Sequence, residues 1–78
     1  MNLGYLQTER AMTTKYESRK QPGLYYWAEG QTIDGVTTYS VVAQANGYPA
    51  SEAHDDWFVD FATADAVAKQ LANETAQP

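Results

Sequence analysis

Apolar and polar residues alternate along the middle of the chain, in the stretch 24-LYYWAEGQTIDGVTTYSVVAQ-44. Aromatic and β-branched residues are enriched there, and both are typical of β-strands. The pair Asp34-Gly35 interrupts the run, and this dipeptide is a strong signal for a two-residue hairpin turn. The pattern therefore predicts two long antiparallel strands joined by a tight turn.

Counting outward from this turn predicts the register of the hairpin. The expected pairs are Ile33 with Val36, Glu29 with Ser40, and Trp27 with Val42. One face then carries Leu24, Tyr26, Ala28, Tyr39, Val41 and Ala43. The other face carries Tyr25, Trp27, Glu29, Ile33, Val36, Ser40 and Val42.

The C-terminal third of the chain predicts a third strand and a helix. Residues 57–61 alternate, which places Trp57, Val59 and Phe61 on one side of a strand. Thr63 is a suitable N-cap for the helix, and Asp65 is expected in the first turn, where its charge favours the helix dipole. An apolar helical stripe follows at Ala64, Val67, Ala68, Leu71 and Ala72.

These elements predict an α+β fold, an antiparallel sheet of three or four strands packed on one C-terminal helix. A chain of 78 residues has room for a single domain, here 1–78, with residues 1–11 and 74–78 loosely ordered. Residues 1–20 fit two interpretations, an edge strand or a short helix. Met12 is also a candidate alternative start.

Charge is distributed unevenly along the chain. Residues 1–20 carry four basic and two acidic side chains, a net of +2, whereas residues 21–68 contain seven acidic side chains and no lysine or arginine. An acidic body of this kind repels phosphate backbones and attracts basic surfaces. We therefore expect no direct nucleic-acid binding.

Composition excludes several other classes of protein. The chain has no cysteine, so it has no disulfide, thiolate zinc site or cysteine nucleophile. No segment approaches the roughly 18 apolar residues of a membrane span, and the N-terminus lacks the pattern of a signal peptide. We expect a cytoplasmic protein that needs no cofactor.

The segment 54-HDDWFVDF-61 contains the chain's one histidine and three carboxylates. A strand sends the adjacent Asp55 and Asp56 to opposite sides, so their adjacency is not a chelating geometry. Acid/base catalysis needs a second positioned group, and His54 is the only imidazole available to pair with Ser51, a tyrosine or a carboxylate. The pattern favours either a polar loop with Asp60 facing solvent, or an acidic docking surface, over a metal or catalytic site.

The aromatic residues of the hairpin allow two interpretations. Single-strand binders pair stacked rings with basic grooves, and the hairpin has no basic residue. Tyr25 and Trp27 lie on the face that a single helix leaves uncovered, and their residue types are enriched at binding hot spots. That face is a candidate interface for a second copy or another protein, unless the N-terminal segment covers it.

Two resemblances to known families bear on this interpretation. The segment 57-WFVDFATADAVAKQLANE-74 resembles the last strand and helix of the arm-binding domains of phage integrases, which bind DNA through basic strands that this chain lacks. In size, acidity and one-sheet-one-helix build, the whole chain resembles the anti-CRISPR proteins of phages. That resemblance implies an inhibitor that occupies a nucleic-acid surface of a CRISPR effector complex.

The sequence thus predicts a non-enzymatic inhibitor, encoded by a phage or mobile element, that docks on the basic groove of a nucleic-acid-handling protein. The alternative is a small self-associating domain, such as a homodimer, with no inhibitory role. The residues expected to contact the partner are Glu29, Asp34, Asp55, Asp56, Asp60, Tyr25 and Trp27.

Overall fold

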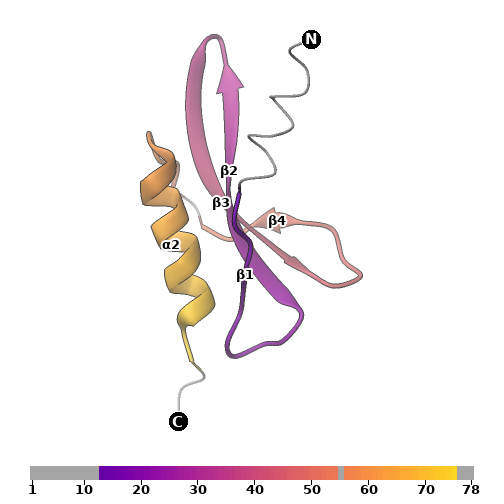
Figure 1. The fold of residues 1–78 in the computed structure, drawn as a ribbon. Helices are drawn as coiled ribbons and strands as arrows, with labels where there is room; N and C mark the ends of the chain where they lie inside the picture. The colour runs from indigo at the N-terminus through magenta and orange to yellow at the C-terminus, as the bar shows by residue number, and fades with distance from the viewer. Residues whose placement is uncertain (1–12, 55, 76–78) are drawn as a thin grey trace, which may run out of the picture.

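The computed structural model describes residues 13–54 and 56–75, which form a four-stranded sheet and one helix. The elements in chain order are β1 (Tyr16–Glu17), β2 (Leu24–Ile33), β3 (Val36–Ala45), β4 (Ser51–Glu52) and α2 (Phe61–Asn73). The strands are antiparallel in the order β1-β2-β3-β4, and α2 lies along one side of the hairpin (Figure 1). The predicted α+β fold is confirmed.

β2 and β3 form the predicted hairpin, and its register is confirmed at all three expected pairs. The two turn residues adopt positive φ angles, 52° at Asp34 and 78° at Gly35. A type I′ turn requires positive φ at both central positions, which aspartate tolerates and glycine adopts without a Cβ penalty. Turn chemistry and strand alternation therefore specify the same register.

The core lies between α2 and the face of the sheet that carries Ala28 and Val41. Ala64 and Ala68 are fully buried against these two residues, as the predicted stripe requires. Their small side chains let the helix backbone approach the sheet closely. Larger, partly buried side chains surround this centre: Tyr16, Tyr26, Tyr39, Ala53, Phe58, Val67 and Leu71.

α2 begins earlier than the sequence predicts. Its N-cap is Asp60, not Thr63, because the Asp60 carboxylate accepts hydrogen bonds from the Thr63 backbone N–H at 3.2 Å and the Thr63 hydroxyl at 2.8 Å. Asp65 consequently lies beyond the first turn of the helix. Aspartate and threonine are both good N-caps, and here they cooperate, with the aspartate in the capping position.

The prediction of a strand over residues 57–61 is wrong. Only Phe58 pairs with the sheet, through reciprocal backbone hydrogen bonds of 2.8 Å with Tyr39, and the helix has already begun at Phe61. The fourth strand instead comes from Ser51–Glu52, which precedes the predicted segment in the chain. The predicted strand cannot reach Phe61, because Asp60 caps α2 and residues at a helix N-terminus cannot continue a strand.

The expectations for the N-terminal region are settled only in part. Tyr16 belongs to the short edge strand β1, as one of the two interpretations proposed. The short-helix alternative, the loosely ordered segment 1–11 and the candidate start at Met12 lie outside the described residues. So do residues 76–78 of the expected C-terminal tail.

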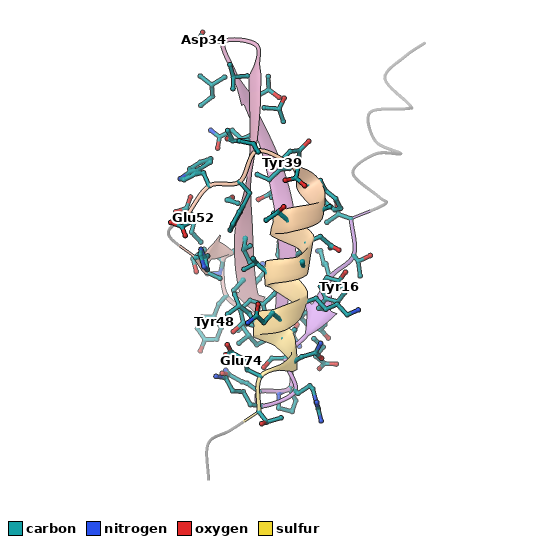
Figure 2. All side chains as sticks on the ribbon, turned by 90° about the vertical axis from the view of Figure 1, so that its left-hand side faces the viewer. Tyr16, Asp34, Tyr39, Tyr48, Glu52 and Glu74 are labelled. Carbon is teal, nitrogen blue, oxygen red and sulfur yellow. The ribbon has the colours of Figure 1, made fainter. Side chains whose placement is uncertain are left out.

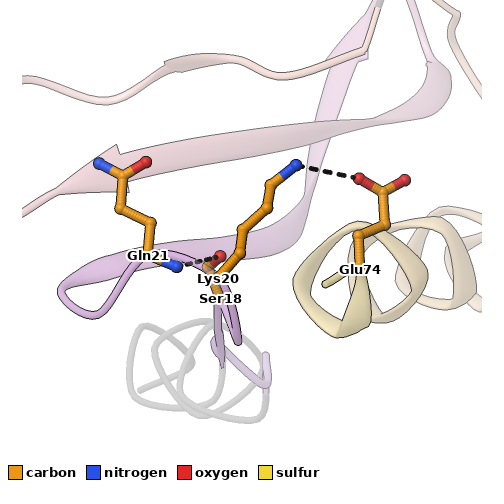
Figure 3. Close-up of polar contacts among 4 residues, drawn as sticks. All are labelled: Ser18, Lys20, Gln21 and Glu74. Carbon is orange, nitrogen blue, oxygen red and sulfur yellow. Dashed lines mark hydrogen bonds and ion pairs between the residues drawn. The ribbon is translucent and has the colours of Figure 1, made fainter. Parts of the chain in front are cut away.

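The chain between β1 and β2 is fastened to the last turn of α2. The Gln21 backbone N–H donates to the Ser18 hydroxyl at 3.1 Å, and the Lys20 ammonium lies 3.5 Å from the Glu74 carboxylate (Figure 3). The Arg19 backbone N–H also donates to a carbonyl near the end of α2. These contacts hold the C-terminal end of the helix against the sheet. Among the described residues, no helix has the length and apolar character needed to cross a membrane.

Candidate docking surface

Four of the eight acidic side chains that the structure describes accept a hydrogen bond or pair with a lysine, namely Glu17, Asp60, Asp65 and Glu74. The Glu17 carboxylate accepts a hydrogen bond of 3.0 Å from the Gly23 backbone N–H, Glu74 pairs with Lys20, and Asp60 caps α2. A carboxylate committed to a cap is a poor docking group, because a partner would have to compete with the helix for it. The expected role of Asp60 in partner binding therefore has no geometric support.

Asp65 connects the helix to the edge of the sheet. The Tyr16 hydroxyl donates to its carboxylate, at 2.9 Å from each oxygen, across 49 residues of sequence. The pKa of Tyr16 is raised above its usual 10.0, because partial burial disfavours the charged phenolate and the hydrogen bond to the negative Asp65 favours the protonated form. No pattern in the sequence indicates this long-range pair.

Glu29, Asp34 and Glu52 differ from these residues. They are exposed, and within the described part of the chain no hydrogen bond or ion pair engages their carboxylates. Glu29 pairs with Ser40 and Glu52 pairs with Val42, so both lie on the sheet face opposite α2. We call this side the open face. Its exposed residues are Glu29, Gln31, Ile33, Val36 and Glu52.

The geometry of the open face separates its two carboxylates. Glu29 and Glu52 are two strands apart laterally and two residues apart along the strands, a Cα separation of about 12 Å. Asp34 lies farther out, at the tip of the hairpin beyond the N-terminal end of α2 (Figure 2). An extended surface with several cations matches this spacing better than a single ion does.

Apolar side chains accompany the carboxylates. Ile33 and Val36 face each other beside the turn and are 59% and 63% exposed. Trp57 and Val59, on either side of the Phe58 bridge, are also exposed. The open face therefore combines exposed apolar groups with negative charge.

The aromatic contribution differs from the expectation. Trp27 is only 8% exposed, and the Lys15 ammonium lies 4.5 Å from the centroid of its ring. Val42, opposite Trp27, is buried as well, and Tyr25 is half-buried. The expectation that Trp27 is an uncovered contact residue is wrong. Phe58 packs against the core.

His54 is engaged locally. Its Nδ1 accepts a hydrogen bond of 3.2 Å from the Asp56 backbone N–H, so in the neutral ring the proton is on Nε2. The Asp56 carboxylate is 3.9 Å from Nδ1, with its side chain 75% exposed. The ring also lies against Phe58. This geometry is typical of a surface turn that a histidine side chain stabilises.

No group of three or more metal-ligating side chains occurs among residues 13–54 and 56–75. Asp55 falls outside the described residues, so its expected docking role has no structural counterpart. Glu52 is the surface residue that sequence reasoning did not select, because the short strand that orients it was not predicted. Comparisons of the chain with protein-family models, curated proteins and solved structures found no match.

Proposed function

We propose that this protein is a non-enzymatic binding domain whose open face docks on a basic, nucleic-acid-binding surface of another protein and inhibits it. One observation carries the proposal: Glu29, Asp34 and Glu52 are exposed and unengaged within the described residues, in a 48-residue block with no lysine or arginine. Exposed carboxylates attract a basic groove before contact, which increases the association rate.

The exposed apolar residues support the same proposal. Charge alone gives steering and weak, salt-sensitive attraction, whereas burial of apolar side chains contributes affinity. Ile33 and Val36 are placed between the tip carboxylate Asp34 and the carboxylate of Glu29. A partner would therefore present cations around an apolar centre, as protein surfaces that hold nucleic acid through arginine and aromatic residues do.

The first target class that we propose is the CRISPR effector complex, and the site of action the cytoplasm of a host cell. The support is the resemblance in size, acidity and fold to small phage inhibitors that occupy the nucleic-acid surfaces of these complexes. The proposed mechanism is competition, in which the acidic protein takes the place of a phosphate backbone.

The experiment measures target-DNA binding by purified CRISPR effector complexes with and without the protein, at low and high salt. We expect inhibition that weakens as salt rises. The variant Glu29→Gln/Glu52→Gln should raise the inhibitory concentration about tenfold, because it removes two charges from the open face. His54→Ala should inhibit like the wild type.

A matched control distinguishes an effect of the open face on inhibition from an effect of the protein's net charge. The variant Gln70→Lys/Asn73→Lys changes the net charge by the same two units at exposed positions of α2. We expect it to retain inhibition. Equal weakening by both double variants would assign the effect to overall charge and reject the open face, and loss of activity in His54→Ala alone would reject docking by carboxylates altogether.

A further inference from the structure

The turn that follows β3 contains the dipeptide Asn46-Gly47, which the proposed function does not use. Both residues are exposed to solvent, and Gly47 has a φ angle of 85°. That backbone conformation favours glycine, because a residue with a Cβ is strained there. The turn therefore requires a residue without a side chain directly after an asparagine.

The fold holds both sides of this dipeptide but leaves its central peptide unit free. The Asn46 backbone N–H donates to the Gly23 carbonyl at 2.9 Å. The Tyr48 backbone N–H donates to the Ala45 carbonyl at 3.0 Å. Among the described residues, no hydrogen bond engages the Asn46 carbonyl or the Gly47 N–H. The peptide unit that joins them can therefore rotate without breaking a backbone hydrogen bond of the fold.

The side-chain amide of Asn46 is accessible to the backbone nitrogen of Gly47. The amide nitrogen lies beside Gly23, 3.2 Å from the position that a Cβ of Gly23 would take, and within the described part of the chain it has no hydrogen-bond partner. Apart from its two chain neighbours, Gly47 has no atom within 4 Å of its own Cβ position. No side-chain hydrogen bond described by the structure therefore has to break before the Gly47 nitrogen approaches the Asn46 Cγ.

We propose that this turn makes Asn46 a site of spontaneous deamidation. The Gly47 backbone nitrogen loses its proton to a solvent base and attacks Cγ of Asn46, so that a new Cγ–N bond forms. The bond from Cγ to Nδ2 breaks, and Nδ2 takes up a proton from water and leaves as ammonia. Water then opens the resulting succinimide at either of its carbonyl carbons, which yields aspartate or isoaspartate. Because the attack is intramolecular, water is the only other reactant.

Asn73 provides the opposite case within the same chain. It is also exposed, but it ends α2, and the backbone N–H that follows it, on Glu74, donates to the Leu71 carbonyl at 3.3 Å. Glu74 also carries a side chain, whose carboxylate lies 3.5 Å from the Lys20 ammonium. The attacking nitrogen at this position is thus both hydrogen-bonded and sterically hindered. We therefore expect deamidation at Asn46 and not at Asn73.

Either product adds a carboxylate where the chain had a neutral amide. Isoaspartate also lengthens the main chain, because its backbone runs through the former side-chain carbon. The altered turn leads into β4, which places Glu52 on the open face. Deamidation thus changes both the charge and the connection of this part of the sheet, whether or not the open face has the proposed role.

The first test measures the masses of tryptic peptides after the folded protein has stood for days in neutral buffer. Residues 21–68 contain no lysine or arginine, so trypsin releases Asn46 as the only asparagine of peptide 21–69 and Asn73 as the only asparagine of peptide 70–78. We expect peptide 21–69 to gain the mass of one amide-to-acid conversion, and peptide 70–78 to keep its mass. Asn46→Gln should abolish the gain, because the longer side chain would have to close a larger ring.

The products identify the route of the reaction. Fragmentation of peptide 21–69 should show isoaspartate beside aspartate at position 46, because a succinimide opens at both carbonyl carbons. Aspartate alone would indicate direct hydrolysis of the side chain and would overturn the attack by Gly47. An equal mass gain in peptide 70–78 would overturn the assignment to this turn.

The second test asks whether the folded turn permits the reaction or whether the chain must first unfold. The rate of mass gain at Asn46 is measured in native buffer and in a denaturing concentration of urea at the same pH. We expect the two rates to agree within about tenfold, because only one free peptide unit has to rotate. A reaction that needed global unfolding would be slower in the native protein by about a thousandfold or more. A native rate reduced by that factor, or no mass gain at Asn46, would overturn the proposal.

Discussion

The two halves of the β2–β3 hairpin belong to one continuous ladder of backbone pairs, but they differ in how deeply their residues are buried. From Leu24 to Ala28, every residue of β2 is buried or half-buried, with Tyr26 and Ala28 facing α2, whereas from Glu29 to Ile33 every residue is exposed. The covered half is stabilised by burial, and the bare half by cross-strand pairs, the turn and the bridge between Tyr39 and Phe58. The same strands therefore serve as a core in one half and present a surface in the other.

The largest expected effect is a difference in stability between two valine truncations, one in each half of the hairpin. Val41→Ala should lower the free energy of unfolding by about 2 kcal/mol, because it removes two buried methyl groups and leaves a cavity beside Ala64. Val36→Ala, at 63% exposure in the bare half, should cost only a few tenths of a kcal/mol. Urea denaturation of both variants measures the difference, and equal losses would contradict it.

The next effect concerns the hydrogen bond from Tyr16 to Asp65, which joins the edge of the sheet to α2. Tyr16→Phe should destabilise the protein by about 1 kcal/mol, because Asp65 loses its hydrogen-bond donor in a partly buried position. The folded state raises the pKa of Tyr16, so the contribution of this group is present below pH 10 and is lost as pH rises through the folded pKa. The gap between wild type and Tyr16→Phe should therefore narrow above pH 10 in thermal melts.

The third effect distinguishes a cap from a docking carboxylate. Asp60→Ala should cost about 1 kcal/mol, because the first turn of α2 loses its side-chain acceptor, whereas Asp60→Asn keeps an acceptor and should cost little. Asp56→Asn, on an exposed side chain, should leave stability unchanged. Circular dichroism melts would show the contrast. A strong loss in Asp60→Asn would mean that the charge, and not the cap geometry, is needed.

The smallest effect is expected in the bare half. Thr32→Val/Thr37→Val removes the hydroxyl contact but keeps two β-branched residues facing each other, so stability should change by less than about 0.5 kcal/mol. Chemical denaturation, followed through the spectra of the hairpin amides, measures this change in stability. A loss as large as that of Val41→Ala would show that the bare half, despite its exposure, contributes as much as the core.

The hairpin was predictable from sequence because its determinants are local. Asp34-Gly35 specifies the turn, and alternation specifies the faces, so the register followed by counting. The apolar stripe of the helix at Ala64 and Ala68 could likewise be predicted from the sequence. The start of the helix could not be predicted, because Asp60 and Thr63 are both good caps and the alternating residues around them resemble a strand.

The surface was less predictable than the fold. Whether a carboxylate is engaged depends on contacts between residues distant in sequence, such as Asp65 with Tyr16. The burial of Trp27 likewise involves Lys15 lying over the indole, which alternation cannot reveal. The acidity of the block was visible from the sequence, but only the fold separates Glu29 and Glu52, which face outward and have no partner among the described residues, from Asp60, which stabilises a helix.

The order of strands in the sheet follows the order of synthesis. Each strand pairs with the one made just before it, so most pairings close short loops and need little chain entropy. α2 comes last and covers Ala28 and Val41 after the hairpin can already form. We therefore expect rapid refolding, in milliseconds or less, with the hairpin ahead of helix docking, and stopped-flow tryptophan fluorescence would detect a slower course.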